Sequence, residues 1–370
     1  MNIPTIDLFS GAGGLSYGLK SCGLDIRAAV EIDPNAINTY KRNIGDVVID
    51  RDISEISGKE LLEFAGIKKG EMFILAGCPP CQGFSSVGPR DETDIRNQLV
   101  FQYVRLILET RPWFIIMENV PGMSRGIGKA IFAEVKIILS DYYILNDDIL
   151  DSANYGVPQH RKRLVMHGVL KTIAEKYLPP GFELQMPEIT HKNPEILDES
   201  KQDWLTVDVI RDLPFLKAGG DDSDIPNHRC RGLSELNIER IKHTPHNGGS
   251  RDSWPEDLIL DCHKGNVVYS DVYGRMDFKS QAPTITAGCL IYSKGRFGHP
   301  EQDRPISARE AARLQTFPDE FVFEGNLEMV GRQIGNAVPP KLAEASGRHI
   351  IEIIKKYDIA KKAKRSKKKE

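Results

Sequence analysis

Two cysteines lie three positions apart in the stretch GCPPCQGFSS, which runs from Gly77 to Ser86. The spacing of Cys78 and Cys81 fits three kinds of chemistry: a redox dithiol, half of a zinc site, or one activated nucleophile beside an uninvolved thiol. Residues elsewhere in the chain must decide among them.

The first two kinds of chemistry are disfavoured. A structural zinc ion needs four ligands, and the sequence has no second C-x-x-C and no histidine pair at the usual spacing, so we predict no metal site. A thioredoxin-like dithiol opens a helix directly, whereas CPPCQGFSSVGPRDE continues as a segment rich in glycine and proline. Redox chemistry stays open as the poorer alternative.

A cysteine nucleophile needs an acid, a base or a cation close by. The candidates are Glu118, in ENV at the end of an apolar run, and Arg161 and Arg163 in PQHRKR. Glu118 is also compatible with a hydrogen bond at the end of a sheet, and the arginines with an ordinary surface strand. Their order at the ends of successive strands favours chemistry.

The elements that must position these residues follow a βα pattern. Up to residue 170, short apolar runs such as TIDLF, MFILAG and PWFIIMEN alternate with helix-like segments, which is typical of a mostly parallel sheet. We therefore predict a doubly wound α/β fold. Ligands of such folds bind where loops leave the carboxyl ends of the strands, and the unusual residues of this chain follow those ends.

A glycine-rich turn, SGAGG, follows the first predicted strand. It is only a weak relative of the dinucleotide fingerprint, because Ser16 occupies the sixth position counted from Gly11. A turn without any ligand is equally compatible with these residues. Glu31 lies about 20 residues further on, where an acidic residue often meets ribose hydroxyls. Asp33 and Pro34 also fit a helix start.

Composition changes divide the chain into five predicted parts. We expect a catalytic and cofactor-binding domain at 1–170, an irregular smaller domain at 171–303, a hinge segment with a short helix at 304–329, a C-terminal helix at 330–358 that returns to the first domain, and a basic disordered tail at 359–370. The short helix is expected to begin with a Ser307 and Glu310 capping box.

Charge and hydropathy limit the classes of function. The net charge is −3, and removing the last ten residues, with their seven cations and one anion, leaves 42 Lys and Arg against 51 Asp and Glu. The body is therefore acidic, so any surface that binds nucleic acid must be local. No apolar run reaches the length of about 18 residues that a membrane span needs, and the sequence predicts a cytoplasmic protein without membrane contact.

Six segments in order resemble the motifs of the DNA (cytosine-5) methyltransferases, over about 3–341. They are DLFSGAGGLSYGL, GCPPCQGFS, ENV, GVPQHRKRLVMHG, SAREAARLQTFPD and GRQIGNAVPP. The resemblance implies a Rossmann-like methyltransferase fold with a smaller target-recognition domain. It also implies S-adenosylmethionine as methyl donor, S-adenosylhomocysteine as product and no metal.

The resemblance assigns the catalytic roles. It makes Cys81 the nucleophile that adds to C6 of cytosine, so that C5 becomes reactive enough to take a methyl group. Glu118 is implied to hold the N3 and N4 edge, and Arg163 the O2 atom, with Arg161 as support. The positions implied to line the cofactor are Phe9, Gly11, Ala12, Gly13, Glu31, Ile32, Asp52, Ile53, Gly77, Pro79, Leu99, Asn336 and Val338.

The implied substrate is a cytosine flipped out of duplex DNA, because C5 and C6 are hidden within the stacked helix. The smaller domain would read the sequence, with HNGGSRDSWP (246–255) and HRCRG (228–232) as candidate contacts; a plain surface loop has equal weight. The positions expected to meet the substrate are Pro80, Gln82, Ser85, Asn119, Val120, Arg229 and Arg251.

Three partner expectations and two alternatives complete the interpretation. We expect duplex DNA as partner, association with the nucleoid when bound to DNA, and a monomer that belongs to a restriction-modification system with a cognate endonuclease. One alternative is the same chemistry on transfer RNA. The other is a catalytically dead or thiol-sensing protein that binds nucleic acid.

Overall fold

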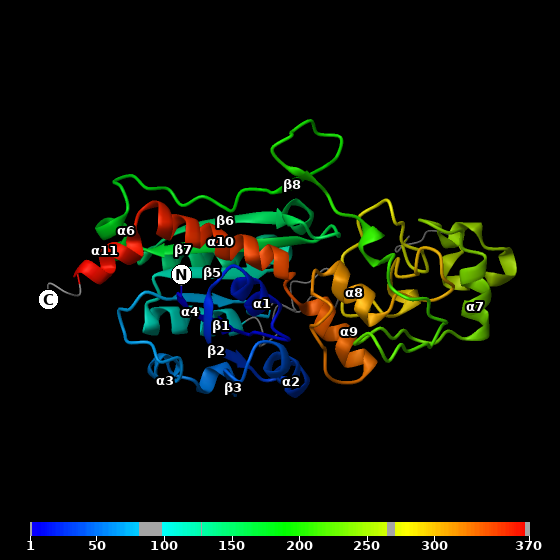
Figure 1. The fold of residues 1–370 in the computed structure, drawn as a ribbon, viewed down its shortest axis with the longest axis horizontal. Coiled ribbons are helices and arrows are strands. Elements are labelled where there is room, and N and C mark those ends of the chain that lie inside the picture. The colour runs from blue at the N-terminus through cyan, green and yellow to red at the C-terminus, as the bar shows by residue number, and fades with distance from the viewer. Residues whose placement is uncertain (1, 81–97, 127, 265–270, 367–370) are drawn as a thin grey trace. The chain divides into compact units, whose positions relative to one another are not determined.

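The computed structural model describes residues 2–80, 98–126, 128–264 and 271–366 (Figure 1). The chain forms two compact units. The first, here called the sheet unit, comprises Met1–Asp151, Lys162–Ile189 and Pro340–Glu370. The second unit comprises Ser152–Arg161 and Thr190–Pro339.

The sheet unit contains a seven-stranded sheet with the order β3-β2-β1-β4-β5-β7-β6. The pairs among β1 to β5 are parallel, whereas β7 runs antiparallel to both β5 and β6. The strands are β1 Pro4–Leu8, β2 Asp25–Glu31, β3 Val48–Asp50, β4 Ile74–Gly77, β5 Phe114–Asn119, β6 Tyr143–Asp151 and β7 Lys162–Leu170. The predicted doubly wound, mostly parallel sheet is confirmed.

Helices flank this sheet, and their ends follow ordinary capping chemistry. Asp33 caps one of them by accepting from the backbone N–H groups of Asn35 and Ala36, with Pro34 in the first helical position. The helices of the sheet unit are α1 Gly14–Ser21, α2 Pro34–Asn43, α3 Gly58–Phe64, α4 Leu99–Thr110, α5 Gly128–Ser140, α6 Lys171–Tyr177, α10 Pro340–Lys356 and α11 Ile359–Ser366.

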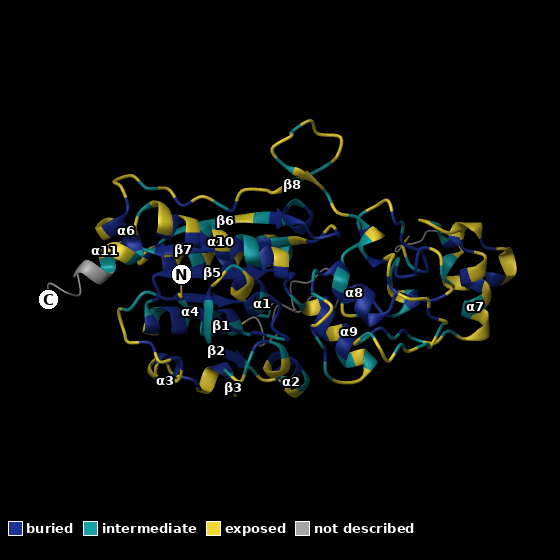
Figure 2. Cartoon of the chain, viewed as in Figure 1, coloured by how far each residue is buried: buried dark blue, intermediate teal, exposed yellow. Residues whose placement is uncertain are grey.

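The two faces of the sheet differ in chemistry. On one face, buried residues of β1, β4 and β5 such as Leu8, Leu75 and Met117 join an apolar core with buried residues of α3, α4 and α5 (Figure 2). Residues on the other face include Asp7 and His167, which belong to one row because Asp7 pairs with Ala76, Ala76 with Ile116 and Ile116 with His167. We call this the polar face.

Two helices cover the polar face. Ser16 of α1 donates a hydrogen bond to Asp7, and His349 of α10 stacks on His167 with 5.6 Å between ring centroids. The helices also touch each other closely, because a Cβ atom on Gly18 of α1 would lie 2.1 Å from the carbonyl oxygen of Pro340. The long C-terminal helix α10 therefore packs directly against α1, the first helix of the chain.

The second unit has few regular elements. They include two-residue strands, β8 His191–Lys192 and β9 Gln202–Asp203, and the helices α7 Glu235–Lys242, α8 Ala308–Leu314 and α9 Leu327–Asn336. Buried arginines connect its loops: the guanidinium of Arg275 donates to the carbonyl oxygens of Ile241, Thr244, His299 and Gln302. The expected capping box of Ser307 and Glu310 is confirmed at the start of α8.

The unit boundaries differ from the predicted ones. Residues 152–161 belong to the second unit, 171–189 belong to the sheet unit, and the return to the sheet unit begins at Pro340 rather than at 330. The expected disorder at 359–370 is also wrong for its first part, because residues up to Ser366 form α11 and Ile359 is fully buried. Among the described residues, none of the helices combines the length and apolar character that a bilayer crossing requires.

Candidate active site

The glycine-rich turn after β1 is tied to the end of β2 by Glu31. One carboxylate oxygen of Glu31 accepts from the N–H of Gly11 at 2.8 Å, and the other accepts from Ile32 and Asp33 at 2.9 Å. Gly11 (φ 54°) and Gly13 (φ 96°) adopt the left-handed conformation that favours glycine. The structure thus brings together four predicted cofactor residues, Gly11, Gly13, Glu31 and Ile32.

Two further predicted cofactor positions follow β1 and β3. Phe9 adopts φ 58°, a conformation that costs a residue with a side chain on the order of 1 kcal/mol and is often retained at functional sites. Asp52 accepts hydrogen bonds from the backbone N–H and the hydroxyl of Ser54, which hold the pKa of its carboxyl below the ordinary value. Asp52 therefore caps the short helix that begins at Ile53.

The loop after β4 is anchored to the end of β5. The side-chain amide of Asn119 donates to the carbonyl oxygen of Pro79 at 2.9 Å, and its oxygen accepts from the N–H of Val120 at 2.8 Å. Gly77 is required for the close approach of its neighbours, because a Cβ there would lie 2.8 Å from the Tyr103 ring. Cys81, Gln82 and Ser85 lie outside the described residues.

Glu118 and Arg163 form an ion pair at the carboxyl end of β5. Nε of Arg163 lies 2.9 Å from Oε1 of Glu118, and both side chains are largely buried, with 13% and 11% of their surfaces exposed. Nη1 of Arg163 also donates to the carbonyl oxygen of Lys162 at 2.8 Å. A buried charge needs such a partner, since an isolated one would cost several kcal/mol.

The Cys78 thiol is the third group at this end of the sheet, because Cys78 follows Gly77, and Gly77 pairs with Met117, the neighbour of Glu118. Burial of the thiol raises its pKa well above the ordinary value, and the negative charges of Glu118 and Asp7 raise the pKa further. The thiol therefore remains protonated near neutral pH. Cys78 itself is thus a poor nucleophile.

Asp7 lies deeper on the polar face and was missed by the sequence analysis. Its Oδ2 accepts from the Ser16 hydroxyl at 2.7 Å, and Ser16 in turn lies 2.7 Å from the Tyr40 hydroxyl. Burial raises the pKa of Asp7 to about 7. Among the described residues, Oδ1 of Asp7 has no hydrogen-bond partner. The sequence does carry a signal from which Asp7 could have been found, because an acidic residue inside the apolar run TIDLF is unusual.

Arg161 donates hydrogen bonds inside the second unit. Its guanidinium donates to the carbonyl oxygens of Ile285 at 2.6 Å, Gly335 at 2.8 Å and Ala337 at 3.0 Å, all within the second unit. These bonds fix the backbone on both sides of Asn336. The expected support of Arg163 by Arg161 stays a prediction.

The predicted positions near the C-terminus belong to the second unit. Asn336 is the last residue of α9 and Val338 is buried two residues later. The other described positions of the predicted cofactor site belong to the sheet unit; they are Phe9, Gly11, Ala12, Gly13, Glu31, Ile32, Asp52, Ile53, Gly77, Pro79 and Leu99.

The expected DNA-reading arginines are engaged inside the second unit. Arg251 is only 6% exposed, and Nη2 of Arg229 donates to the carbonyl oxygen of Gly325 at 2.7 Å. The loop around Arg251 is packed as well, since Arg296 donates to the carbonyl oxygens of Gly248 and Gly249. The side chain of Arg251 is buried in this structure, and its expected contact with DNA stays a prediction.

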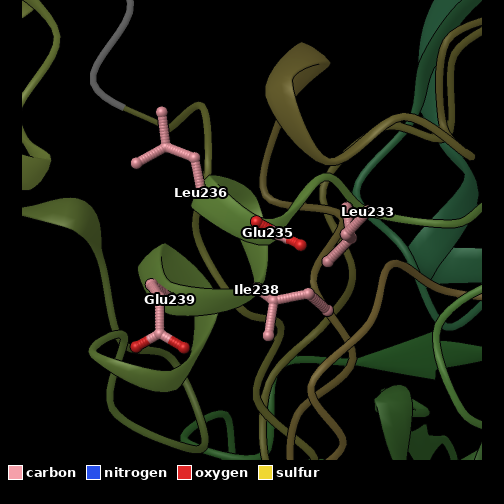
Figure 3. A pocket seen from close by; sticks show the side chains of 5 residues that line it. All are labelled: Leu233, Glu235, Leu236, Ile238 and Glu239. Atoms are coloured by element: carbon pink, nitrogen blue, oxygen red, sulfur yellow. The ribbon is translucent and has the colours of Figure 1, made fainter.

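A pocket opens on α7 in the second unit (Figure 3). Its lining combines apolar side chains with two carboxylates, and consists of Leu233, Glu235, Leu236, Ile238 and Glu239. The carboxylates disfavour a phosphate backbone at this position. The described part of the chain holds no cluster of three or more potential metal-ligating side chains.

Sequence comparisons identify the family of this chain. The model of the C-5 cytosine-specific DNA methylase family matches residues 3–352. The Type II methylase M.HgiDII of Herpetosiphon aurantiacus is 39% identical over 360 residues, which cover 95% of each chain. The Type II methyltransferase M1.HphI of Haemophilus parahaemolyticus is 34% identical over 95% of this chain and 88% of its own length.

Solved structures show the same architecture. A crystal structure described as a DNA modification methyltransferase encoded within a prophage (E. coli) superposes with a TM-score of 0.71 and 26% identity, covering 96% of this chain and all of the other. A methyltransferase of Entamoeba histolytica, at 16% identity and a TM-score of 0.62, shares the fold over 96% of this chain and 99% of its own length. The family match spans nearly the whole chain, so this protein belongs to the C-5 cytosine-specific DNA methylase family.

Proposed function

We propose that this protein transfers a methyl group from S-adenosylmethionine to C5 of a cytosine in a specific duplex DNA sequence. The observation that carries the proposal is the buried pair of Glu118 and Arg163, in which Glu118 precedes in β5 the Asn119 side chain that holds Pro79. An acid and a cation at this place match what covalent addition to a pyrimidine needs.

The turn after β1 suits the methyl donor. A Cβ on Gly11 would meet no atom within 4 Å, so the backbone leaves open space for a ligand beside the Glu31 carboxylate. When bound, S-adenosylmethionine supplies an electrophilic methyl carbon. Glu31 and Gly11 would hold its ribose side, and Phe9 would lie against it.

The proposed chemistry begins at Cys81. Its thiolate forms a bond to C6, and the electron density that reaches the ring is stabilised by protonation at N3, which the Glu118 carboxylate favours. Arg163 orients the pyrimidine through O2. The electron pair at C5 then forms the bond to the methyl carbon, and the bond of that carbon to sulfur breaks with its electrons remaining on sulfur.

Two further events complete the reaction. A base removes the C5 proton, and the bond between Cys81 and C6 breaks as the thiolate leaves. The cytosine must be extruded from the duplex for any of this to occur, at a cost of a few kcal/mol. Asn336 and Val338, in the segment held by Arg161, stay predicted cofactor positions.

The relatives suggest the biological setting. M.HgiDII and M1.HphI carry Type II names, and we extend that assignment to this chain as a monomeric modification enzyme whose target is shared with a cognate endonuclease. The second unit would read the target sequence.

The test is methyl transfer with radiolabelled S-adenosylmethionine and two acceptors, unmethylated duplex DNA and transfer RNA. We expect label in DNA only, and bisulfite sequencing of the product should map it to cytosines within one recurrent sequence. Cys81→Ser should abolish transfer, whereas Cys262→Ser, which changes an exposed cysteine of the second unit, should not. Label confined to transfer RNA, or full activity of Cys81→Ser, would overturn the proposal.

A further inference from the structure

Tyr40 of α2 is completely buried against the glycine-rich turn that follows β1. A Cβ on Gly13 would lie 3.0 Å from Cδ2 of the Tyr40 ring, so the ring packs directly on the backbone of the turn. The Tyr40 hydroxyl lies 2.7 Å from the hydroxyl of Ser16, which belongs to the first turn of α1. One side chain of α2 therefore contacts both the glycine-rich turn and the helix that follows it.

The two hydroxyl groups and the Asp7 carboxyl form a chain of hydrogen bonds with a defined direction. Ser16 has one hydroxyl hydrogen and donates it to Oδ2 of Asp7 at 2.7 Å, so Tyr40 is the donor to Ser16. Burial, followed by the charge of Asp7, raises the pKa of Tyr40 well above its ordinary value, which keeps this donor protonated. All three side chains are fully buried, where a hydrogen bond is electrostatically stronger than in water.

The glycine-rich turn needs support from outside its own sequence. Phe9, Gly11 and Gly13 have φ values of 58°, 54° and 96°; the value at Phe9 is unfavourable, and glycine adopts positive and negative φ with similar ease. The bond from Ser16 to Asp7 closes this segment, because it joins residues on either side of the turn. Tyr40 in turn holds the Ser16 hydroxyl that makes this bond.

We propose that Tyr40 is a positioning residue for the methyl-donor site, whose hydroxyl acts through Ser16 to hold the glycine-rich turn in the conformation that receives the donor. This inference rests on the proposed function. Without the hydroxyl, the turn occupies that conformation for only part of the time, and the apparent affinity for the donor falls in proportion. Tyr40 touches neither donor nor cytosine in this role.

The first experiment measures binding of S-adenosylhomocysteine to the full chain by isothermal titration calorimetry, with Tyr40→Phe as the variant. Phenylalanine keeps the ring against Gly13 and removes only the hydroxyl. We expect the Kd to rise about fivefold, because one buried hydrogen bond that holds the turn is lost. In methyl transfer to unmethylated duplex DNA, KM for S-adenosylmethionine should rise with it, while kcat stays within about twofold of the parent.

The matched control is Tyr143→Phe. Tyr143 is another buried tyrosine of the sheet unit, and its hydroxyl donates to the carbonyl oxygen of Pro112 at 2.9 Å. It belongs to β6, which β4, β5 and β7 separate from β1 in the sheet order. This variant loses a hydrogen bond of the same kind, yet its Kd should equal that of the parent. A parental Kd in Tyr40→Phe, or an equal rise in both variants, would overturn the proposal.

The route through Ser16 is tested by a double-mutant cycle. Ser16→Ala should raise the Kd at least as much as Tyr40→Phe, and the double variant should bind as Ser16→Ala does, because the Tyr40 hydroxyl acts only on Ser16. Increases that multiply in the double variant would show that Tyr40 does not act through Ser16.

The second experiment examines the turn without any ligand. The backbone N–H groups of Gly11 and Gly13 donate to Glu31 and to the carbonyl oxygen of Ser10, so their hydrogen exchange requires the turn to open. Mass spectrometry of the peptide that covers 9–16 should show exchange about fivefold faster in Tyr40→Phe and unchanged in Tyr143→Phe. Unchanged exchange in Tyr40→Phe would contradict the proposal. If the parent binds no S-adenosylhomocysteine, the proposed function fails, while the exchange rates still report whether Tyr40 holds the turn.

Discussion

Nε of Arg163, from β7, lies 2.9 Å from Oε1 of Glu118, from β5, and the antiparallel pairing of these strands sets the two side chains on one face. The pair crosses the point where the sheet changes from parallel to antiparallel. The geometry of the ion pair therefore depends on the pairing of β5 with β7, which no local sequence pattern predicts.

The ion pair should show strong coupling in a double-mutant cycle. Removing one partner leaves the other charge buried, so Glu118→Ala and Arg163→Ala should each lower the free energy of unfolding by about 3 kcal/mol or more. The double variant should lose much less than the sum of the two. Urea unfolding at pH 7.5 measures all four proteins, and additive losses would mean that the pair is not formed in solution.

Asp7 should make the sheet unit less stable as pH rises. Its pKa is about 7 in the folded protein, so between its ordinary value of 3.8 and about 7 the folded state binds a proton that the unfolded state has released. Stability from this group is then lost with increasing pH in that window. Asp7→Asn removes the effect, so the stability of the variant relative to the parent should increase by about 3 kcal/mol between pH 5 and pH 8.

The measurement for Asp7 is chemical unfolding at both pH values, with Asp25→Asn as a control. Asp25 is a carboxylate of the same unit that pairs with Arg27 near the protein surface. A pH dependence that is the same in Asp7→Asn and in the parent would contradict a raised pKa for Asp7.

His167 should make the protein less stable as pH falls, which is opposite to the effect of Asp7. Burial, followed by the neighbouring His349, lowers its pKa from 6.5 to about 3, and neither ring nitrogen has a hydrogen-bond partner among the described residues. The unfolded state therefore takes up a proton below pH 6.5 that the folded state refuses, and stability falls as pH falls. At pH 5 this group costs about 2 kcal/mol relative to neutral pH.

Replacing His167 with phenylalanine should flatten the acid side of the stability profile. Thermal unfolding of parent and His167→Phe, followed at pH 7.5 and pH 5, gives the comparison. His349→Phe is the matched variant, and its effect should be smaller because this ring is less buried. If the parent and His167→Phe lose the same stability on acidification, His167 does not carry the effect.

Gly335 should not tolerate a side chain. A Cβ there would lie 2.1 Å from the backbone carbon of Thr286, whereas a Cβ on Gly331, one turn earlier on α9, would lie 3.2 Å from a flexible Leu290 side chain. We expect Gly335→Ala to destabilise the second unit by several kcal/mol, because the new Cβ would collide with backbone. Gly331→Ala should have little effect, because the helix propensity of alanine, about 1 kcal/mol better than that of glycine, offsets the close contact with Leu290. Limited proteolysis of residues 190–339 distinguishes the two outcomes.

The predictable part of this molecule is local in sequence. The alternation of apolar runs and helices predicted β1, β4 and β5, and Glu31, about 20 residues beyond the glycine-rich turn, was singled out beside that turn, where it accepts from Gly11. The capping of α8 was also predicted, because Ser307 and Glu310 are three residues apart. The capping bonds of α8 depend on residues close in sequence, and the contact of Glu31 with Gly11 depends on the pairing of β1 with β2.

Contacts across long separations in the chain could not be predicted from the sequence. Arg161 bonds carbonyl oxygens more than 120 positions away, and only the folded second unit shows that its donors are used there. Arg251 belongs to a polar, glycine-containing stretch that suggests exposure, yet it is buried. Asp7 shares a row with His167 through pairing across the sheet, which the sequence of one strand does not contain.

The order in which the sheet unit is assembled follows from the contact between α1 and α10. The ribosome makes α1 near the beginning of synthesis and α10 only after the whole second unit, so the polar face lacks one of its two covering helices for most of translation. A chain interrupted before Pro340 would retain every residue proposed to touch the base and still leave His167 exposed to water. Maturation of this protein is thus coupled to completing its C-terminal part, and nascent fragments should be good substrates for cellular proteases.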